Sequence, residues 1–529
     1  MKVLLNLLKE LNQAFGNQLI EMFKSLYFIF CVAFFMLRPC FYGQVNSSLI
    51  TIKQAESLSY DSEKTSAKIL HGNVIAEHNG SLLHCDTALF FEADNKIFAS
   101  GHILITKGDS IRVTGDKLIY DGKIRMAFIE NNVKCIEKDM ILTTDFLTFD
   151  VANSIANYTN GGKIVNKQNT LTSKNGHYYS SSKEAAFHFD VILLNPDYKM
   201  NCDTLRYRIP SKTAFFLGPS IILSKQDYIY CENGWYDTNK DKAQFSKNSI
   251  LITSQQKLKG DSLFYDRKLK VGRAFRNVTL IDTSKKSIIY GDYIEYKEKK
   301  SEALVTKNAL YARIFDLDTL FVSADTLYHI DIDSIHSILN AYHHVMVYKK
   351  NLQAICDSSS MTSKDSLLQL FYNPVLWSNL SQATAKKINI VVGKKSVKSF
   401  KLEGKSFLIQ QVDSTNLNLF NQLLGKIIEG DIQNDTIRHI NVSGNAEIMY
   451  YIKNKNKMVG LDKTNCSKID ISFKSGDIER VSLYPNTKGL VDPFKSIDVE
   501  NARLKGFNWL YAKRPLSRFS LNKKVNKIN

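Results

Sequence analysis

The feature that most constrains this chain is a five-residue phrase that recurs along its first two-thirds. The phrase reads acidic residue, any residue, apolar residue, any residue, aromatic residue, as in Asp116-x-Leu118-x-Tyr120 and Asp261-x-Leu263-x-Tyr265. Its copies, including weaker ones, begin at Glu56, Asp86, Asp116, Asp145, Asn175, Asp203, Glu232, Asp261, Asp292 and Asp325, at spacings of 28 to 33 residues. A period of this length indicates stacked units, each of which buries its apolar face against its neighbours.

Many copies have a second half that reads as a turn followed by another strand. An Ala comes seven to nine residues after the aromatic, then a Gly or Asn turn, as at Ala127 before Asn131-Asn132. Gly and Asn tolerate the positive φ that tight strand connections need. The next segment alternates with period two, as in Ile103-x-Ile105. Each repeat therefore predicts two or three short strands with no helical periodicity, and the fold class is all-β.

The acidic position of the phrase and the position before it are both predicted to have structural roles. The position before it is mostly small, with Cys85, Gly115, Thr144, Cys202, Cys231, Gly260, Gly291 and Ala324. Small residues suit a sharply bent strand or two closely approaching layers, which favours packed thiols. Disulfides are the alternative for the six cysteines beyond the leader. The acidic residues share one phase, so they are predicted to be turn or corner residues, since a catalytic pair would break the repeat.

The apolar and aromatic columns are the candidate ligand-binding residues. If the repeats stack, with each repeat forming one rung, these residues would lie in continuous rows along the array. They either fill a sealed core or line an apolar groove, and periodicity alone does not separate the two. The groove candidates are Leu58, Tyr60, Ala88, Phe90, Leu118, Tyr120, Leu147, Phe149, Leu205, Tyr207, Leu263 and Tyr265.

The N-terminal segment predicts export. Lys24 precedes an apolar run from Leu26 to Leu37, which suits the core of a signal peptide better than a spanning helix. Cleavage before Gln44 makes residues 1–43 the signal peptide. An uncleaved anchor, or a lipoprotein modified at Cys40, is the alternative.

A longer period follows the first repeat region. Three similar segments place Gly404, Gly444 and Tyr484 at a spacing of 40 residues, each after a β-prone stretch, and 417–424 is the one segment with a helical pattern. The chain is therefore divided into a repeat domain over 44–350, a second β domain over 351–512 and a basic, flexible tail over 513–529.

Composition and motifs narrow the function classes. The net charge of +18 suits anionic partners, although lysines spread along the chain are also compatible with a general preference for Lys. The cysteines form no CxxC or Cys/His cluster, so no metal is expected. The sequence contains no GxSxG, HExxH or P-loop pattern and no nucleic-acid-binding motif. We therefore expect no enzyme activity, no catalytic residues, no cofactor and no nucleic-acid partner.

Several phrases, in their order and phase, resemble the OstA-like family of Gram-negative envelope proteins of the type found in Bacteroidetes. They are Gly72-Asn73-Val74, Gly115-Asp116-x-Leu118-x-Tyr120-Asp121, Pro374-Val375-Leu376-Trp377, Gly444-Asn445-Ala446 and Leu504-Lys505-Gly506-Phe507-x-Trp509. This family is related to the periplasmic LptA, LptC and LptD N-terminal domains of lipopolysaccharide transport. The resemblance covers nearly the whole chain beyond the leader, which is far longer than a single LptA-type domain.

The resemblance implies a fold and a function. The fold would be an elongated β-jellyroll or β-taco, in which two antiparallel sheets meet in a V around an apolar interior. The function would be a periplasmic bridge component that shields the acyl chains of lipopolysaccharide during outer-membrane assembly and meets its phosphates with Lys and Arg. Partners would be other Lpt-type bridge proteins, joined by edge-strand pairing, or further copies of the chain. The alternatives are an exported structural or adhesive β-solenoid and, less favoured, a polysaccharide-degrading enzyme.

Overall fold

The computed structural model describes residues 49–518, apart from short gaps between elements, of which 413–417 is the longest. The chain divides into two compact units. Unit 1 ends at Ser254 and also includes Lys259–Gly272, whereas unit 2 contains Gln255–Leu258 and continues from Arg273. The predicted leader, 1–43, and residues 519–529 of the predicted tail lie outside the described residues. The predicted boundary at residue 350 falls between two strands of unit 2 and stays a prediction.

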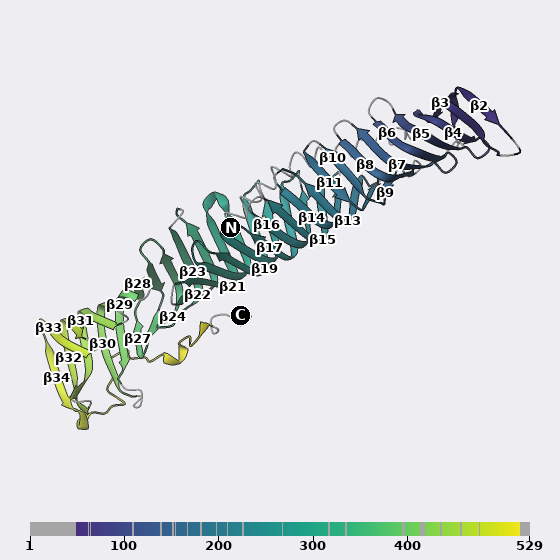
Figure 1. Ribbon diagram of the computed structural model, residues 1–529. Coiled ribbons are helices and arrows are strands. Elements are labelled where there is room, and N and C mark those ends of the chain that lie inside the picture. Colours follow the sequence, from purple (N-terminus) through teal and green to yellow (C-terminus); the bar gives the residue numbers. More distant parts are fainter. Residues whose placement is uncertain are drawn as a thin grey trace, which may run out of the picture. The chain divides into compact units, whose positions relative to one another are not determined.

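The described chain is β structure almost throughout, as predicted (Figure 1). In unit 1 the strands are β1 (Thr51–Gln54), β2 (Ser57–Tyr60), β3 (Lys68–His78), β4 (Ser81–Phe91), β5 (Lys96–Lys107), β6 (Ile111–Asp121), β7 (Met126–Glu137), β8 (Met140–Asp150), β9 (Ile155–Tyr158), β10 (Gly162–Asn166), β11 (Asn169–Ser173), β12 (Asn175–Tyr179), β13 (Glu184–Leu194), β14 (Tyr198–Arg208), β15 (Thr213–Ser224), β16 (Tyr228–Asp237) and β17 (Lys242–Ile252). The division between the units falls within β18 (Gln256–Asp266) and β19 (Val271–Asp282).

Unit 2 continues with the same kind of strand. They are β20 (Ser287–Lys297), β21 (Glu302–Ile314), β22 (Thr319–Asp331), β23 (Ser337–Lys349), β24 (Leu352–Thr362), β25 (Leu367–Phe371), β26 (Val375–Ser378), β27 (Ser381–Thr384), β28 (Lys387–Val392), β29 (Val397–Gln411), β30 (Phe420–Gln433), β31 (Thr436–Asn454), β32 (Lys457–Lys474), β33 (Asp477–Tyr484) and β34 (Lys488–Pro493). Among the described residues of unit 2, single 3-10 turns are η2 (Glu298–Lys300), η3 (Phe494–Ser496) and η4 (Tyr511–Lys513). No helix in the described part of the chain has the length and apolar character needed to cross a membrane.

Each repeat consists of two long antiparallel strands rather than two or three short ones. In the pair β4 and β5, of 11 and 12 residues, the register shifts at Gly101-His102, where φ is +78° and +44°. The same shift recurs at Asn131-Asn132 in β7 and at Lys307-Asn308 in β21. Such two-residue bulges bend the strand sharply. The halves before and after the bulges form the two sheets that meet in a V, as predicted.

The repeated acidic residue holds the bulge of the next strand, which confirms its predicted corner role. The Asn132 amide donates to Asp116 Oδ2 at 2.7 Å, and Asn308 donates to Asp292 Oδ2 at 2.7 Å. In β5 a histidine takes the same place, with His102 Nδ1 2.7 Å from Asp86 Oδ2. Asn and Gly are frequent at these positions because they adopt positive φ more readily than other residues.

The column of small residues lies on the inner side of this bend. A Cβ on Gly115 would stand 2.7 Å from Ile129 Cγ2, and one on Gly291 would stand 2.6 Å from Val305 Cγ1. Larger side chains would therefore force the strands apart at the corner. The close approach predicted for this column is confirmed.

Aromatic and alanine side chains alternate from strand to strand along the interior of unit 1. Direct cross-strand pairing joins Tyr120, Ala127, Phe149, Ala156, Tyr178, Ala185, Tyr207, Ala214, Tyr236 and Ala243 in one row. From Phe149 onward each ring thus lies between two alanines, which lets bulky groups fit at the strand spacing. This aromatic–alanine row explains the Ala that follows each aromatic residue in the sequence.

Two local predictions are wrong. At the copy read as Asn175-x-His177-x-Tyr179, the interior ring is Tyr178, which is 2% exposed, so the phrase is shifted there by one residue. The shift arises where short strands, β9 to β12, replace the long strands of the other repeats. The predicted helical segment 417–424 contains the start of β30, because Phe420 pairs with β29 and residues from Gln422 onward pair with β31 as well. Tertiary pairing overrides the local helical pattern of this segment.

Candidate functional site

Most of the groove candidates are brought together by the fold into rows. Phe90, Tyr120, Phe149 and Tyr207 lie on the course of the aromatic–alanine row or its extension through Ile97. A second row runs Leu58, Leu70, Ala88, Ala99, Leu118, Ile129 and Leu147. Leu205 occupies a third, between Phe187 and Phe216. Leu263 and Tyr265 are interior side chains of β18, and Tyr60 lies opposite Lys68 on the first rung.

The rows are sealed along much of their length. Leu205, Tyr207, Leu263 and Tyr265 are 0%, 2%, 1% and 3% exposed. Ala88, Phe90, Leu118 and Leu147 are also buried, whereas Tyr120 and Phe149 are half-buried. The interior is therefore a packed apolar core in this structure rather than an open trough, and the assignment of these residues to ligand binding stays a prediction.

The tightness of the interior is clearest around Gly234. A Cβ built on Gly234 would stand 1.8 Å from Cε2 of Phe216, the residue directly opposite on β15. The Phe216 ring therefore lies against the backbone of β16, where only glycine leaves room for it. This contact explains why the repeat has glycine at a position that is usually apolar.

The rows become accessible at the first rung of unit 1. Leu58 and Tyr60, both in β2, are each 58% exposed, whereas Leu70, paired with Leu58, is fully buried. Unit 2 also has apolar side chains on its last strands, where Leu490 and Val491 of β34 are 61% and 58% exposed. The two terminal rungs thus expose apolar surface that a further rung could cover.

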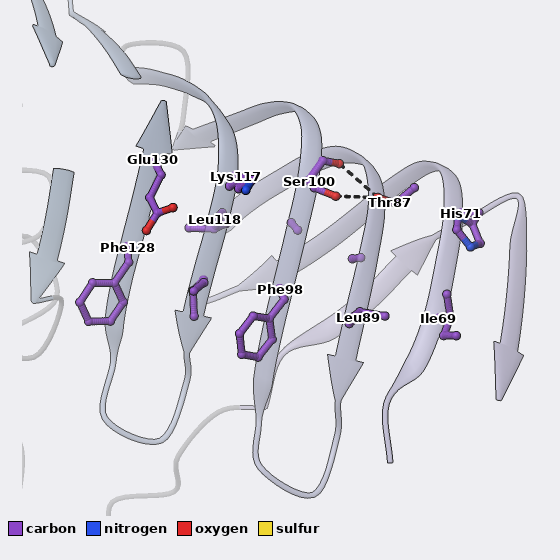
Figure 2. Close-up of a pocket in the computed structure, with 13 residues that line it drawn as sticks. Ile69, His71, Thr87, Leu89, Phe98, Ser100, Lys117, Leu118, Phe128 and Glu130 are labelled. Atoms are coloured by element: carbon purple, nitrogen blue, oxygen red, sulfur yellow. Dashed lines mark hydrogen bonds between the residues drawn. The ribbon is translucent and has the colours of Figure 1, made fainter. Parts of the chain in front are cut away.

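A shallow hollow of about 280 Å³ lies over β3 to β7, and its lining joins Ala88, Ala99 and Leu118 of the second row to residues of the opposite face of the sheet (Figure 2). Leu89, Phe98, Ile119 and Phe128 are consecutive cross-strand partners there, and Leu89 and Phe98 are 39% and 37% exposed. Sequence reasoning missed this row because it followed only the interior columns. The available signal was that the intervening positions of β4 to β7 are apolar too.

The cysteines of the small-residue column are free and buried, which confirms the packing role for Cys85, Cys202, Cys231 and Cys356. Burial raises the pKa of the Cys85 thiol to about 11. It raises the pKa values of Cys202, Cys231 and Cys356 to about 12. Because the thiolate is the reactive form, these thiols are chemically quiet at neutral pH.

We expect these four thiols to resist iodoacetamide at pH 8 in the folded protein and to react fully after denaturation. Peptide mass mapping of each cysteine, with and without denaturant, measures the difference. Native labelling at Cys231, or a disulfide-linked peptide in the unreduced digest, would contradict the packed-thiol interpretation.

A segment near the C-terminus crosses the strands of unit 2. This strap, residues 497–518, lies beside β27 and β24 in the yellow part of Figure 1. Two buried glutamines hold its backbone. Gln422 donates to Ala502 O at 3.0 Å and accepts from Leu504 N–H at 2.8 Å, and Gln382 makes the same pair of bonds with Asn508 O and Leu510 N–H, at 2.7 Å each.

Aromatic and arginine side chains complete the contact of the strap with the sheet. The Phe420 ring centroid is 5.2 Å from that of Phe507 and 5.0 Å from that of Trp509. The Arg514 guanidinium donates to Gln353 Oε1 at 2.7 Å and lies 5.0 Å from the Tyr511 ring centroid. Residues 513–518 thus belong to the strap. No three His, Cys, Asp or Glu side chains gather into a metal-binding group in the part of the chain that the structure describes.

The bent two-sheet array makes this chain an elongated all-β repeat protein. A comparison with protein families adds information on its first part. The family model described as OstA-like protein matches residues 47–203, the part of the chain that contains the first of the sequence phrases. Among solved structures, the chain matches LptH from Pseudomonas aeruginosa, an LptA-homologous periplasmic component of the lipopolysaccharide transport device. The match has 13% identity and a TM-score of 0.19, and it covers 20% of this chain and 82% of that one. Comparison with curated protein sequences gives no match.

Proposed function

We propose that this protein is a non-enzymatic, periplasmic component of lipopolysaccharide transport that holds acyl chains between its two sheets. The observation that carries the proposal is the set of continuous apolar rows in the OstA-like region, with an accessible first rung at Leu58 and Tyr60. The periplasmic lipopolysaccharide-transport role of the matched LptH agrees with this function. The net charge of +18 suits the phosphates of such a ligand.

Acyl chains would have to replace contacts between the two sheets. Hydrogen-bonded pairing joins neighbouring strands within each sheet, as between β5 and β6, whereas side chains fill the space between the sheets. Opening the V therefore breaks apolar contacts without breaking strand pairing. A ligand would restore those contacts at about 0.8 kcal/mol for each buried CH₂ group. Entry from the first rung needs the least initial opening, since its apolar side chains are already exposed.

The exposed apolar strands at the two ends suit a bridge assembled from several chains. An edge strand has unpaired backbone groups that a neighbouring chain can complete by strand addition. Covering Leu490 and Val491 in the same step would add apolar burial. Other bridge proteins of this type, or further copies of this chain, are the proposed partners.

Photo-crosslinking at adjacent positions tests the interior site. Leu118 faces the interior at 3% exposure, whereas Ile119, the next residue of the strand, points to the opposite face. We expect a photo-reactive amino acid at 118 to label lipopolysaccharide more strongly than the same group at 119, with the half-buried position 149 also labelled. The readout is lipopolysaccharide attached to the purified protein.

The matched pair also separates the alternatives. Equal or stronger labelling at 119 would contradict an interior site. Absence of labelling at 118, 119 and 149 would favour the alternative of a structural or adhesive array, which the sealed central rows also suit.

A further inference from the structure

In unit 2 the strap packs on particular positions of the repeat. These positions therefore form a surface that can bind an extended peptide. In the bulged strands, the first and third residues after the bulge face the interior, and the second and fourth face the other way. In β29, whose bulge is Gly404-Lys405, the second and fourth residues are Phe407 and Ile409. These side chains are only 4% and 1% exposed because strap residues pack over them.

The same positions in three strands of unit 1, β13, β15 and β17, are apolar but uncovered. We call this surface the stripe, and it consists of Ile192 and Leu194 in β13, Ile221 and Leu223 in β15, and Ile250 and Ile252 in β17. Leu194, Leu223 and Ile252 are 42%, 40% and 37% exposed. Cross-strand pairing places them in a row, with Lys199 between the first two and Tyr228 between the last two. The stripe therefore crosses the strands, as the strap does in unit 2.

Two polar side chains of β14 lie between the apolar residues of the stripe. Asn201, between Ile192 and Ile221, has a buried side-chain oxygen that accepts no hydrogen bond from the described residues. Lys199 is exposed and forms no ion pair within the described part of the chain. In unit 2 the corresponding need for polar partners is met by the strap, whose Leu504 N–H donates to Gln422 Oε1 at 2.8 Å. A buried acceptor without a donor destabilises the folded chain, and a donor from a bound segment would remove that cost.

We propose that the stripe of unit 1 binds an extended peptide segment of a partner protein that carries apolar side chains and a carboxylate. The segment crosses the strands, as residues 502–510 do on unit 2. Its apolar side chains cover Leu194, Leu223 and Ile252, a backbone N–H donates to Asn201 Oδ1, and its carboxylate pairs with Lys199. This site is independent of the proposed acyl-chain site, because the stripe and the interior rows are on opposite faces of the sheet.

The chemistry of the stripe favours peptide over a lipid surface. Polar positions, Lys199 and Asn201, alternate with the apolar ones at the spacing of single strands. The described chain already covers the equivalent positions with a peptide, held by amide groups that satisfy its backbone. The charge differs between the two sites, since glutamines hold the strap and a lysine lies in the stripe. We therefore expect an acidic segment in unit 1 in place of a basic one.

Two fluorescent peptides serve as probes for the full chain. One has the sequence of residues 502–514, and the other has Glu in place of Arg503, Lys505, Lys513 and Arg514. We expect the acidic peptide to bind saturably and the basic one more weakly, with fluorescence anisotropy as the measurement. Leu223→Glu should weaken binding of the acidic peptide by about tenfold or more, as loss of a central apolar contact does at other interfaces. Lys199→Glu should reverse the preference between the peptides.

The control variant is Leu89→Glu, at a side chain of nearly the same exposure in the hollow of Figure 2, and it should leave binding unchanged. Unfolding temperatures of all variants are compared to confirm that each is folded. Absence of saturable binding by both peptides, or binding that is unaffected by Leu223→Glu, would overturn the proposal. Binding to anionic vesicles that depends on Leu223, without peptide binding, would overturn it in favour of a membrane surface.

Discussion

Replacing Trp377 by alanine is expected to lower the free energy of unfolding of unit 2 by about 3–5 kcal/mol. Trp377 is fully buried between β24 and β27, and its indole N–H donates to Gln382 Oε1 at 3.2 Å. The same Gln382 holds the strap backbone at Asn508 and Leu510. The substitution therefore creates a cavity and removes one of the donors that orient this glutamine. Denaturant unfolding followed by circular dichroism measures the loss.

The matched control is Trp235→Ala. Trp235 is half-buried on β16 and is not part of the interior rows, so its loss should cost clearly less. Equal losses in the two variants would contradict the assignment of Trp377 to the centre of the strap contact. A chain that ends at Ser496 should show a destabilisation of unit 2 comparable with that of Trp377→Ala, because it uncovers the same surface.

A double-mutant cycle at Phe216 and Gly234 should show strong coupling in the interior of unit 1. Phe216→Ala leaves a ring-sized cavity and should cost about 3–5 kcal/mol. Gly234→Ala places a methyl group within the Phe216 ring and should cost about 1–3 kcal/mol. In the double variant the new methyl occupies part of the space that the ring leaves, so the total loss should be smaller than the sum. Free energies of unfolding for the four proteins measure the coupling energy.

Additive losses, within about 0.5 kcal/mol, would contradict the contact between the ring and the glycine backbone. Gly162→Ala is a useful comparison, since its Cβ would approach the ring of Tyr158 at 2.5 Å and not Phe216. Gly162→Ala and Phe216→Ala should combine additively if the two sites share no partner.

Local signals in the sequence were sufficient to predict the bent structure of a single repeat. The acidic residue, the small residue before it and the Asn or Gly of the bulge lie within about half a repeat of one another, as Asp116 and Asn132 do. Their chemistry is set by the bend itself, which needs positive φ, a hydrogen-bond acceptor and little volume. The phrase fails at Tyr178, where the strands become short and the alternation slips by one residue. A one-residue slip reverses which side chains face the interior.

The candidate site was only partly open to prediction. The interior columns of unit 1 were identified from their spacing, but their exposure was not, because burial depends on how closely the two sheets approach. Spacing also omitted the outward rows, which include Phe98 and Leu223, since apolar residues on both faces of a strand weaken the alternation.

The sequence by itself determined the all-β class, the length of the rung, the corner chemistry and the interior phase, because each depends on residues close together in the chain. Only the tertiary structure decided that the interior rows are packed shut and that residues 497–518 cover one face of unit 2. Arg514 and Gln353 meet across 161 residues, and Gln382 and Leu510 across 128. No local pattern encodes such pairs, since they form only after the intervening strands have stacked and brought both partners to one face.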